Sequence, residues 1–238
     1  MRPPGTKALI RINVAVYAAM VLTGVSPFDP TPAQLIRWGG NIGPLSLGTE
    51  PWRLLASNYL HVGILHLGLN MWCLWNLGAL AERIFDPWTF FLIYTASGLA
   101  GGLASLWGHP MVGGVGASGA IFGLAGALIA ALYFGRLPIP TTAIRGTLKS
   151  LVSFAGYNLL FGAMIPGIDN LAHIGGCLTG LALGAALAGS LMAAPEARAA
   201  RRRGVFVAAA IALAMGFSMV KRVSGPRPSP LAGQDNIR

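Results

Sequence analysis

Long apolar stretches alternate with short polar or charged segments along this chain. A helix needs about 20 residues to cross a hydrocarbon core of about 30 Å. The pattern predicts seven such helices, at residues 9–26, 57–80, 88–107, 115–134, 150–166, 170–193 and 204–220. The remaining long segment, 27–56, contains Trp, Arg, Pro and Gly, and aromatic residues with Arg favour the headgroup region of a bilayer. It is therefore expected to form a structured loop at the membrane interface.

The composition also indicates a membrane protein. Of the 238 residues, 54% are hydrophobic and only 10% are charged, whereas a soluble domain carries about 25% charged residues. Cys73 and Cys177 both lie inside apolar stretches, so they form neither a disulfide framework nor a metal-ligand spacing. The expected fold is an all-α, polytopic membrane protein, with no cofactor and no metal site.

The net charge of +10 could indicate nucleic-acid binding, but the cations lie at the ends of the apolar stretches. That distribution is typical of membrane topology, because cytoplasmic loops carry an excess of Lys and Arg, and no nucleic-acid partner is predicted. A cytoplasmic N-terminus places eleven of the 17 cations inside: Arg2, Lys7, Arg11, Arg83, Arg136, Arg145, Lys149, Arg198, Arg201, Arg202 and Arg203. The six outside are Arg37, Arg53, Lys221, Arg222, Arg227 and Arg238. Four of these follow residue 220, which leaves open whether 204–220 crosses the bilayer completely.

Polar side chains within the predicted spans are costly in lipid and mark candidate functional positions. The second, fourth and sixth predicted helices run in the same direction, so their first turns lie at a similar depth near the outer face. This topology gathers four residues into one layer: Ser118, His66, Asn70 and His173. His109, by contrast, falls in a loop and is expected to be solvated.

Residue spacing predicts how these helices approach one another. His66 and Asn70 are four residues apart and share one helix face, whereas His61 is expected to point elsewhere or to lie in the loop. Small residues repeat on the other two helices and allow close backbone contact in lipid: Gly119, Gly123 and Gly126 on one, and Gly176, Gly180 and Gly184 below His173 on the other. The fourth and sixth helices can therefore come close enough for a hydrogen bond between Ser118 and His173.

These residues together favour serine acyl transfer. A serine hydroxyl needs an adjacent base, and a neutral His suits that role. His66, Asn70 and the unpaired N–H groups at the start of the fourth predicted helix can stabilise an oxyanion. Asp169 is more simply a helix cap, so a Ser118–His173 dyad is predicted. Two other readings remain: Ser118 as a packing residue, and the histidines as haem or ion ligands of a transporter-like bundle.

Three separated motifs resemble the rhomboid family of intramembrane serine proteases. HVGILHLGLNMWCLW (61–75) fits the family's His-x4-His-x3-Asn pattern, GASG (116–119) fits its nucleophile motif, and AHIGGCLTGLALG (172–184) fits its histidine and glycine pattern. The tripeptide PWR (51–53) resembles an element of the first long loop. The resemblance covers about residues 10–193.

The resemblance implies that Ser118 is the nucleophile, that His173 is the general base, and that His66, Asn70 and the Ser118 N–H form the oxyanion hole. Phe122 falls where the family usually has an aromatic residue packed on the histidine. Substrates would be single-span membrane proteins. Separately, the short loops and the lack of long soluble domains favour a bacterial inner membrane as the host membrane. The implied domains are a six-helix core (1–193), a basic loop with a seventh transmembrane helix (194–222) and a disordered tail (223–238). The alternative is a non-catalytic rhomboid-like protein that binds transmembrane clients.

Overall fold

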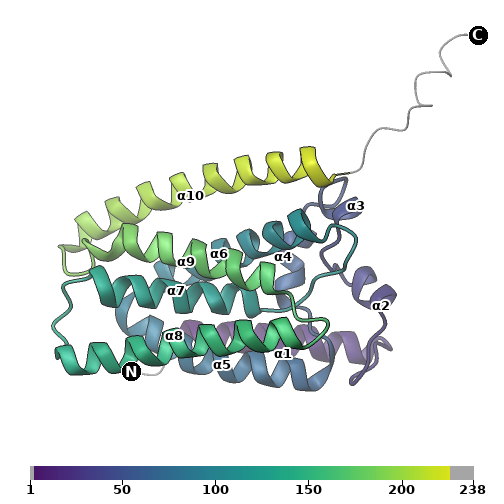
Figure 1. The fold of residues 1–238 in the computed structure, drawn as a ribbon, viewed down its shortest axis with the longest axis horizontal. Coiled ribbons are helices and arrows are strands. Elements are labelled where there is room, and N and C mark those ends of the chain that lie inside the picture. Colours follow the sequence, from purple (N-terminus) through teal and green to yellow (C-terminus); the bar gives the residue numbers. More distant parts are fainter. Residues whose placement is uncertain (1–2, 226–238) are drawn as a thin grey trace, which may run out of the picture.

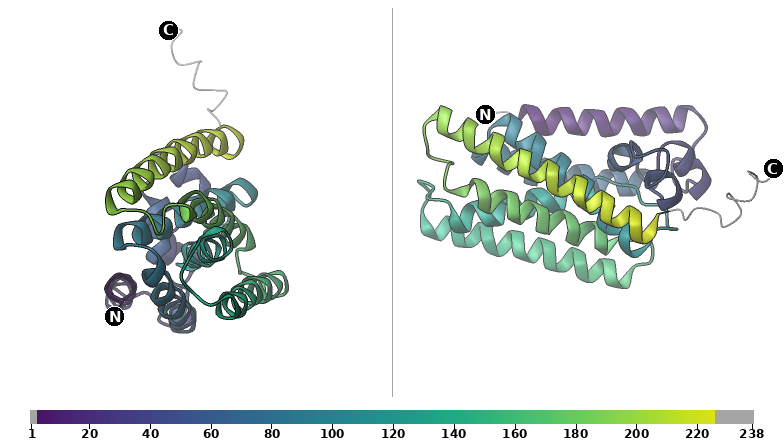
Figure 2. Two further views of the ribbon diagram at one scale, coloured as in Figure 1. Left: turned by 90° about the vertical axis from the view of Figure 1, so that its left-hand side faces the viewer. Right: turned by 90° about the horizontal axis from the view of Figure 1, so that it is seen from above.

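The computed structural model describes residues 3–225, and helices form nearly all of its regular structure (Figure 1). Each of the seven predicted spans coincides with one long helix: α1 (Pro4–Leu22), α5 (Gly63–Ile84), α6 (Pro87–Gly108), α7 (Ser118–Phe134), α8 (Thr141–Met164), α9 (Asn170–Ala188) and α10 (Pro195–Ser224). Four short helices lie between α1 and α5: α2 (Pro32–Arg37), α3 (Gly43–Ser46), α4 (Arg53–Ala56) and η1 (Ser57–Tyr59). The all-α, polytopic fold is confirmed, with six core helices and a seventh that crosses over α6 and α9 (Figure 2).

Five of the seven long helices have the dimensions and composition of membrane spans. Among residues 3–225, five helices are long and apolar enough to cross a bilayer: α1, α5, α6, α9 and α10. The remaining apolar helix, α7, has 17 residues and is buried on nearly all sides. A helix that is apolar all round belongs in the interior of a bundle. The chain is therefore an integral, multi-pass membrane protein, with α7 at its centre.

A seam of small residues joins α7 to α9. Three glycines of α9 each face a backbone carbonyl oxygen of α7. A Cβ atom added to Gly176 would lie 2.0 Å from the oxygen of Gly119, and one added to Gly180 would lie 1.9 Å from that of Gly123. A Cβ atom added to Gly184 would lie 2.5 Å from the oxygen of Ala127. No side chain fits between the two backbones at these points. The predicted close approach is confirmed, and its cause is the absence of side chains in the seam.

The segment between α1 and α5 is structured, as predicted. Arg53 is buried, its Nη1 donates hydrogen bonds to the Ile36 and Gly40 carbonyl oxygens, and it forms an ion pair of 2.8 Å with Glu50. A buried guanidinium is tolerated only when its donors are satisfied. Arg53 thereby ties α4 to the turn that follows α2.

The basic segment 194–203 was expected to be a loop, and this was wrong, because α10 begins at Pro195. Proline is favoured in the first turn of a helix, and Ala and Arg are strong helix formers. The 30 residues of α10 extend over about 45 Å at 1.5 Å per residue, which is long enough to cross a bilayer. Most of the predicted disordered tail, 226–238, lies outside the described residues.

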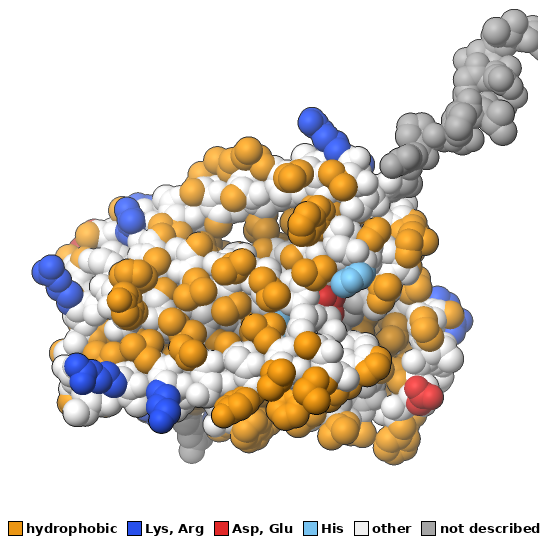
Figure 3. Space-filling model, in the orientation of Figure 1, with side chains coloured by type: hydrophobic (Ala, Val, Ile, Leu, Met, Phe, Trp, Pro, Cys, Tyr) orange, Lys and Arg blue, Asp and Glu red, His pale blue; other side chains and the backbone are white. Residues whose placement is uncertain are grey.

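The two ends of the bundle differ in charge. The serine end is the end at which α5, α7 and α9 begin, and the arginine end is the end at which they stop and α10 begins. Most of the Lys and Arg side chains visible in Figure 3 gather at the arginine end, while hydrophobic side chains cover the length of the helices. At the arginine end, Glu82 accepts hydrogen bonds from the Gly5 and Thr6 N–H groups and so caps α1 from another helix.

Candidate active site

Ser118 is the first residue of α7 and is partly exposed at the serine end. The chain reaches it through Gly116, which has φ of +132°, a value that L-residues rarely adopt. A Cβ at Gly116 would also lie only 2.9 Å from Cε1 of His66. Glycine at 116 therefore meets two requirements at once: it allows the turn into α7, and it lets the His66 ring lie beside the serine.

The loop before Ser118 is held by the segment between α1 and α5. The backbones of Asn41 and Gly114 exchange two hydrogen bonds, of 2.9 and 2.8 Å, and the Gly116 N–H donates to the Ser57 carbonyl oxygen at 2.9 Å. The Asn41 side chain also donates to the Gly102 carbonyl oxygen at 3.0 Å. Sequence reasoning missed Asn41 and Ser57, because no motif or periodicity connects them with a loop more than 50 residues away.

His173 lies opposite Ser118 in the first turn of α9. Its Nε2 is 2.9 Å from Ser118 Oγ. The ring of Phe122 stacks on the imidazole, with a centroid distance of 4.3 Å and an interplanar angle of 6°, and Phe154 of α8 lies 5.5 Å beyond Phe122. Phe122, expected to pack on His173, thus fixes the plane of the ring. Because Nε2 faces a hydroxyl, a neutral His173 carries its proton on Nδ1 when it acts as acceptor.

No described carboxylate binds the other ring nitrogen of His173. Its Nδ1 is buried without a hydrogen-bond partner among residues 3–225. Asp169, four residues earlier, accepts a hydrogen bond of 3.0 Å from the Ala172 N–H and caps α9, as predicted. The geometry is that of a two-residue arrangement, in which Phe122 stacked on the ring face, rather than a third polar group bound to Nδ1, restricts the imidazole.

Candidate hydrogen-bond donors lie on the elements that meet at Ser118. His66 Nδ1 accepts from the Val62 N–H at 3.2 Å, so a neutral His66 carries its proton on Nε2, which faces the Gly116–Ser118 turn. Asn70 lies on the same helix face, and its amide donates one hydrogen bond to the His66 carbonyl oxygen at 2.9 Å. Of the hydrogen bonds formed within residues 3–225, none uses the Ser118 N–H, which is free because it opens a helix.

The other two histidines do not contact Ser118 or His173. His109 is exposed just after α6, as expected. His61 is in the loop before α5 and fully buried, with its ring centroid 5.1 Å from that of His66. Burial lowers the pKa of His61 to about 3, so it is neutral near pH 7. Among the described residues, no three His, Cys, Asp or Glu side chains are grouped to hold a metal ion.

This arrangement suits acyl transfer. The Ser118 hydroxyl contacts an imidazole and the His66 ring lies beside the turn that leads to it, which is the kind of geometry that a serine nucleophile with an adjacent base requires. Ser118 is partly exposed at the serine end, which leaves its hydroxyl open to one side. No other described cluster combines a nucleophile with a base in this way.

Comparison with known proteins points in the same direction. A family model, the rhomboid domain, matches residues 48–190. Rhomboid protease GluP of Bacillus subtilis is 35% identical over 216 residues, which cover 91% of this chain and 40% of that protein. Rhomboid protease AarA of Providencia stuartii is 32% identical over 197 residues, covering 74% of this chain and 69% of that protein. RHOMBOID-like protein 4 of Arabidopsis thaliana is 37% identical over 156 residues, covering 65% and 39% respectively. The chain thus spans less than half the length of two of these relatives.

Proposed function

Because this chain belongs to the rhomboid family, we propose that it is an intramembrane serine endopeptidase that uses Ser118 as nucleophile and His173 as general base. The observation that carries the proposal is the 2.9 Å contact between Ser118 Oγ and His173 Nε2. A serine hydroxyl is a weak nucleophile until a base accepts its proton. Relatives that are called rhomboid proteases support the same reaction class.

In the first step, Ser118 Oγ attacks the carbonyl carbon of a peptide bond and its proton passes to His173 Nε2. The negative charge that develops on the carbonyl oxygen is stabilised by the Ser118 N–H, the His66 Nε2–H and the second N–H of the Asn70 amide. One such donor contributes about 10²–10³ in rate. His66 acts here as a neutral donor, because its other nitrogen is occupied by the Val62 N–H.

The tetrahedral intermediate then collapses. His173 gives its proton to the departing amine, the C–N bond breaks, and the substrate's acyl group remains on Ser118. Water, deprotonated by His173, attacks this ester and releases the second product with Ser118 restored. The Phe122 stack keeps the imidazole plane aligned through both proton transfers.

The proposed substrates are single-span membrane proteins cut near the serine end. The excess of cations at the arginine end supports a cytoplasmic location for that end and for the N-terminus. The proposed host membrane is a bacterial inner membrane. The serine end then faces the outside. The matched range 48–190 lies within the proposed catalytic core, residues 1–193, and α10 is an addition to that core.

Labelling with a fluorophosphonate serine probe tests this function without a known substrate. Wild type should be labelled, Ser118→Ala should not, and His173→Ala should be labelled at least about 10²-fold more slowly, because base catalysis contributes about 10²–10⁴. Ser153→Ala of α8 is the matched control, since it removes a serine elsewhere. A folded wild-type protein that neither reacts with the probe nor cleaves a labile single-span reporter would instead be a non-catalytic rhomboid-like protein. A visible Soret band would indicate haem binding.

A further inference from the structure

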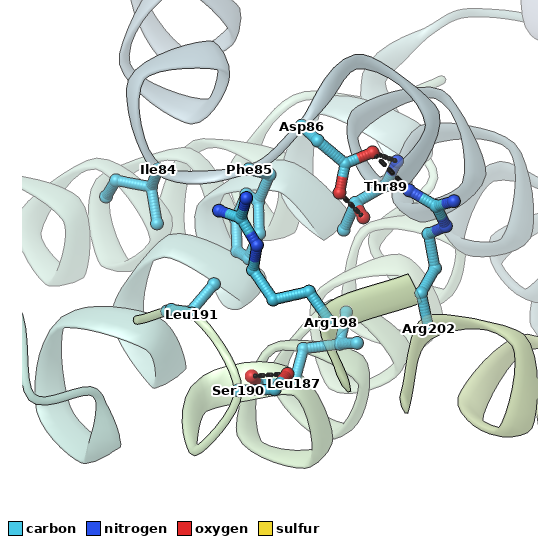
Figure 4. A pocket seen from close by; sticks show the side chains of 9 residues that line it. All are labelled: Ile84, Phe85, Asp86, Thr89, Leu187, Ser190, Leu191, Arg198 and Arg202. Carbon is cyan, nitrogen blue, oxygen red and sulfur yellow. Dashed lines mark hydrogen bonds and ion pairs between the residues drawn. The ribbon is translucent and has the colours of Figure 1, made fainter. Parts of the chain in front are cut away.

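A hollow at the arginine end, far from Ser118, combines apolar walls with two arginines (Figure 4). Ile84, Phe85, Leu187 and Leu191 contribute the apolar surface. Arg198 reaches across the hollow from α10, and Arg202 is turned to one side, where its Nη1 forms an ion pair of 2.6 Å with Asp86. The hollow lies where α5 ends and where α6 and α10 begin, at the level at which a bundle meets lipid headgroups.

A second groove continues from this hollow along α10. Leu92 of α6 faces Phe206, Val207 and Ala210 of α10 across it, and Arg202 and Arg203 stand at its arginine end. Arg202 therefore lines both spaces. The two spaces share Arg202, and together they form the α6–α10 crevice, with cations at the arginine end and an apolar channel about two turns of α10 long, open to the side, that Leu92 of α6 closes opposite.

The charge of the crevice is not balanced by protein. Within residues 3–225 there are two ion pairs, Arg53 with Glu50 and Arg202 with Asp86, so Arg198 and Arg203 have no carboxylate partner. Asp86 offsets one cation of three, and Glu196 in the first turn of α10 forms no ion pair with them. An anion is the ligand that this excess of positive charge would attract.

We propose that the α6–α10 crevice binds a phospholipid with an anionic headgroup, such as a phosphatidylglycerol. The phosphate lies among Arg198, Arg202 and Arg203, and one acyl chain lies along Leu92, Phe206 and Val207. Basic pockets between transmembrane helices suit anionic headgroups, and the apolar channel requires a ligand with a hydrocarbon chain. A soluble phosphate would satisfy the arginines but leave that channel unfilled. The site does not depend on the chemistry proposed at Ser118.

Native mass spectrometry measures the lipid that the protein retains. The full chain is released from detergent to which dioleoyl phosphatidylglycerol or phosphatidylcholine has been added. The test variant is Arg198→Gln/Arg203→Gln, which leaves the Arg202–Asp86 pair intact. The control is Lys221→Gln/Arg222→Gln, which removes the same charge from the other end of α10. A second variant, Ala210→Trp, fills the channel without changing charge. Thermal unfolding in phosphatidylcholine confirms that each variant is folded.

We expect wild type and the Lys221/Arg222 control to retain phosphatidylglycerol in preference to phosphatidylcholine. Arg198→Gln/Arg203→Gln should weaken that retention about thirtyfold. Each cation near a membrane surface contributes about 1 kcal/mol to the binding of an anionic lipid, and 1.4 kcal/mol corresponds to a tenfold change in affinity. Ala210→Trp should also weaken it. Equal retention of the two lipids, or equal loss in the two charge variants, would overturn the proposal. So would displacement of the lipid by millimolar inorganic phosphate, which would indicate a site for a soluble anion.

Discussion

Gly176→Ala is expected to separate the proposed nucleophile from its base without touching either. A Cβ at 176 would lie 2.0 Å from the Gly119 carbonyl oxygen and 2.7 Å from its carbon, whereas ordinary contacts begin at 3.4 Å. Both contacts are with backbone, so no side chain can rotate away and α9 must move from α7 by about 1.4 Å. Residue 176 is one turn from His173, so the shift reaches the site almost undiminished.

The magnitude follows from the hydrogen bond itself. The Ser118–His173 distance of 2.9 Å would lengthen to about 4 Å, beyond the range of a hydrogen bond. A misplacement of about 1 Å can cost about 10²-fold in rate. Overpacking costs about 1–3 kcal/mol of stability, and the better helix propensity of Ala returns about 1 kcal/mol of that. The variant should therefore fold yet react about a hundredfold more slowly.

The assay is the second-order rate of labelling by a fluorophosphonate probe, beside thermal unfolding in the same detergent. Gly184→Ala, with a contact of 2.5 Å three turns below His173, should show a smaller loss. Gly204→Ala in α10, where an added Cβ meets nothing within 4 Å, should label at the wild-type rate. Wild-type labelling by a folded Gly176→Ala would refute the idea that the seam sets the Ser–His distance.

Three further outcomes are expected. Phe122→Leu removes the ring stacked on His173 and should slow probe labelling about tenfold, while Phe122→Tyr, which keeps the stack, should label normally; equal rates in both would contradict the orienting role. Burial lowers the pKa of His61 from 6.5 to about 3, so protonation of this side chain favours the unfolded chain. The stability that the neutral His61 contributes is complete above pH 6.5, and it falls by up to about 1.4 kcal/mol per pH unit as the pH drops toward 3. Thermal unfolding at pH 7 and at pH 5 should therefore show a weaker pH dependence in His61→Asn than in wild type. Glu82→Gln weakens the charge-assisted cap of α1 and should lower the free energy of unfolding by about 1–2 kcal/mol. Glu196 forms no ion pair among the described residues, so Glu196→Gln should change the free energy of unfolding by less than about 0.5 kcal/mol.

The helices of this protein were largely predictable because lipid imposes a strong requirement on sequence. A span is apolar over about 20 residues, so the apolar stretches of the sequence located the seven long helices, five of which meet the length and hydropathy of a span in the structure. Their ends were less accessible. Helix α8 begins at Thr141 rather than near 150, and α10 begins at Pro195, because charged residues at the membrane surface are as compatible with helix as with loop.

The members of the candidate site were also accessible from sequence. Polar side chains at the starts of helices that run in the same direction share one depth, and glycine stripes indicate which helices can touch. That reasoning brought together Ser118 and His173, and the structure has their side-chain atoms at 2.9 Å. Their assignment as nucleophile and base remains a proposal that the labelling experiment addresses.

By itself, the sequence determined the number and order of the long helices, their membrane character and the small-residue faces of α7 and α9, since these depend on local composition and period. The tertiary structure alone decided that α7 lies at the centre, that Asn41 and Ser57 hold the turn before Ser118, and that Glu82 caps α1. The reason is physical. These contacts join residues by backbone hydrogen bonds and helix packing, whose partners are set by how whole helices fit together rather than by the identity of neighbours in the chain.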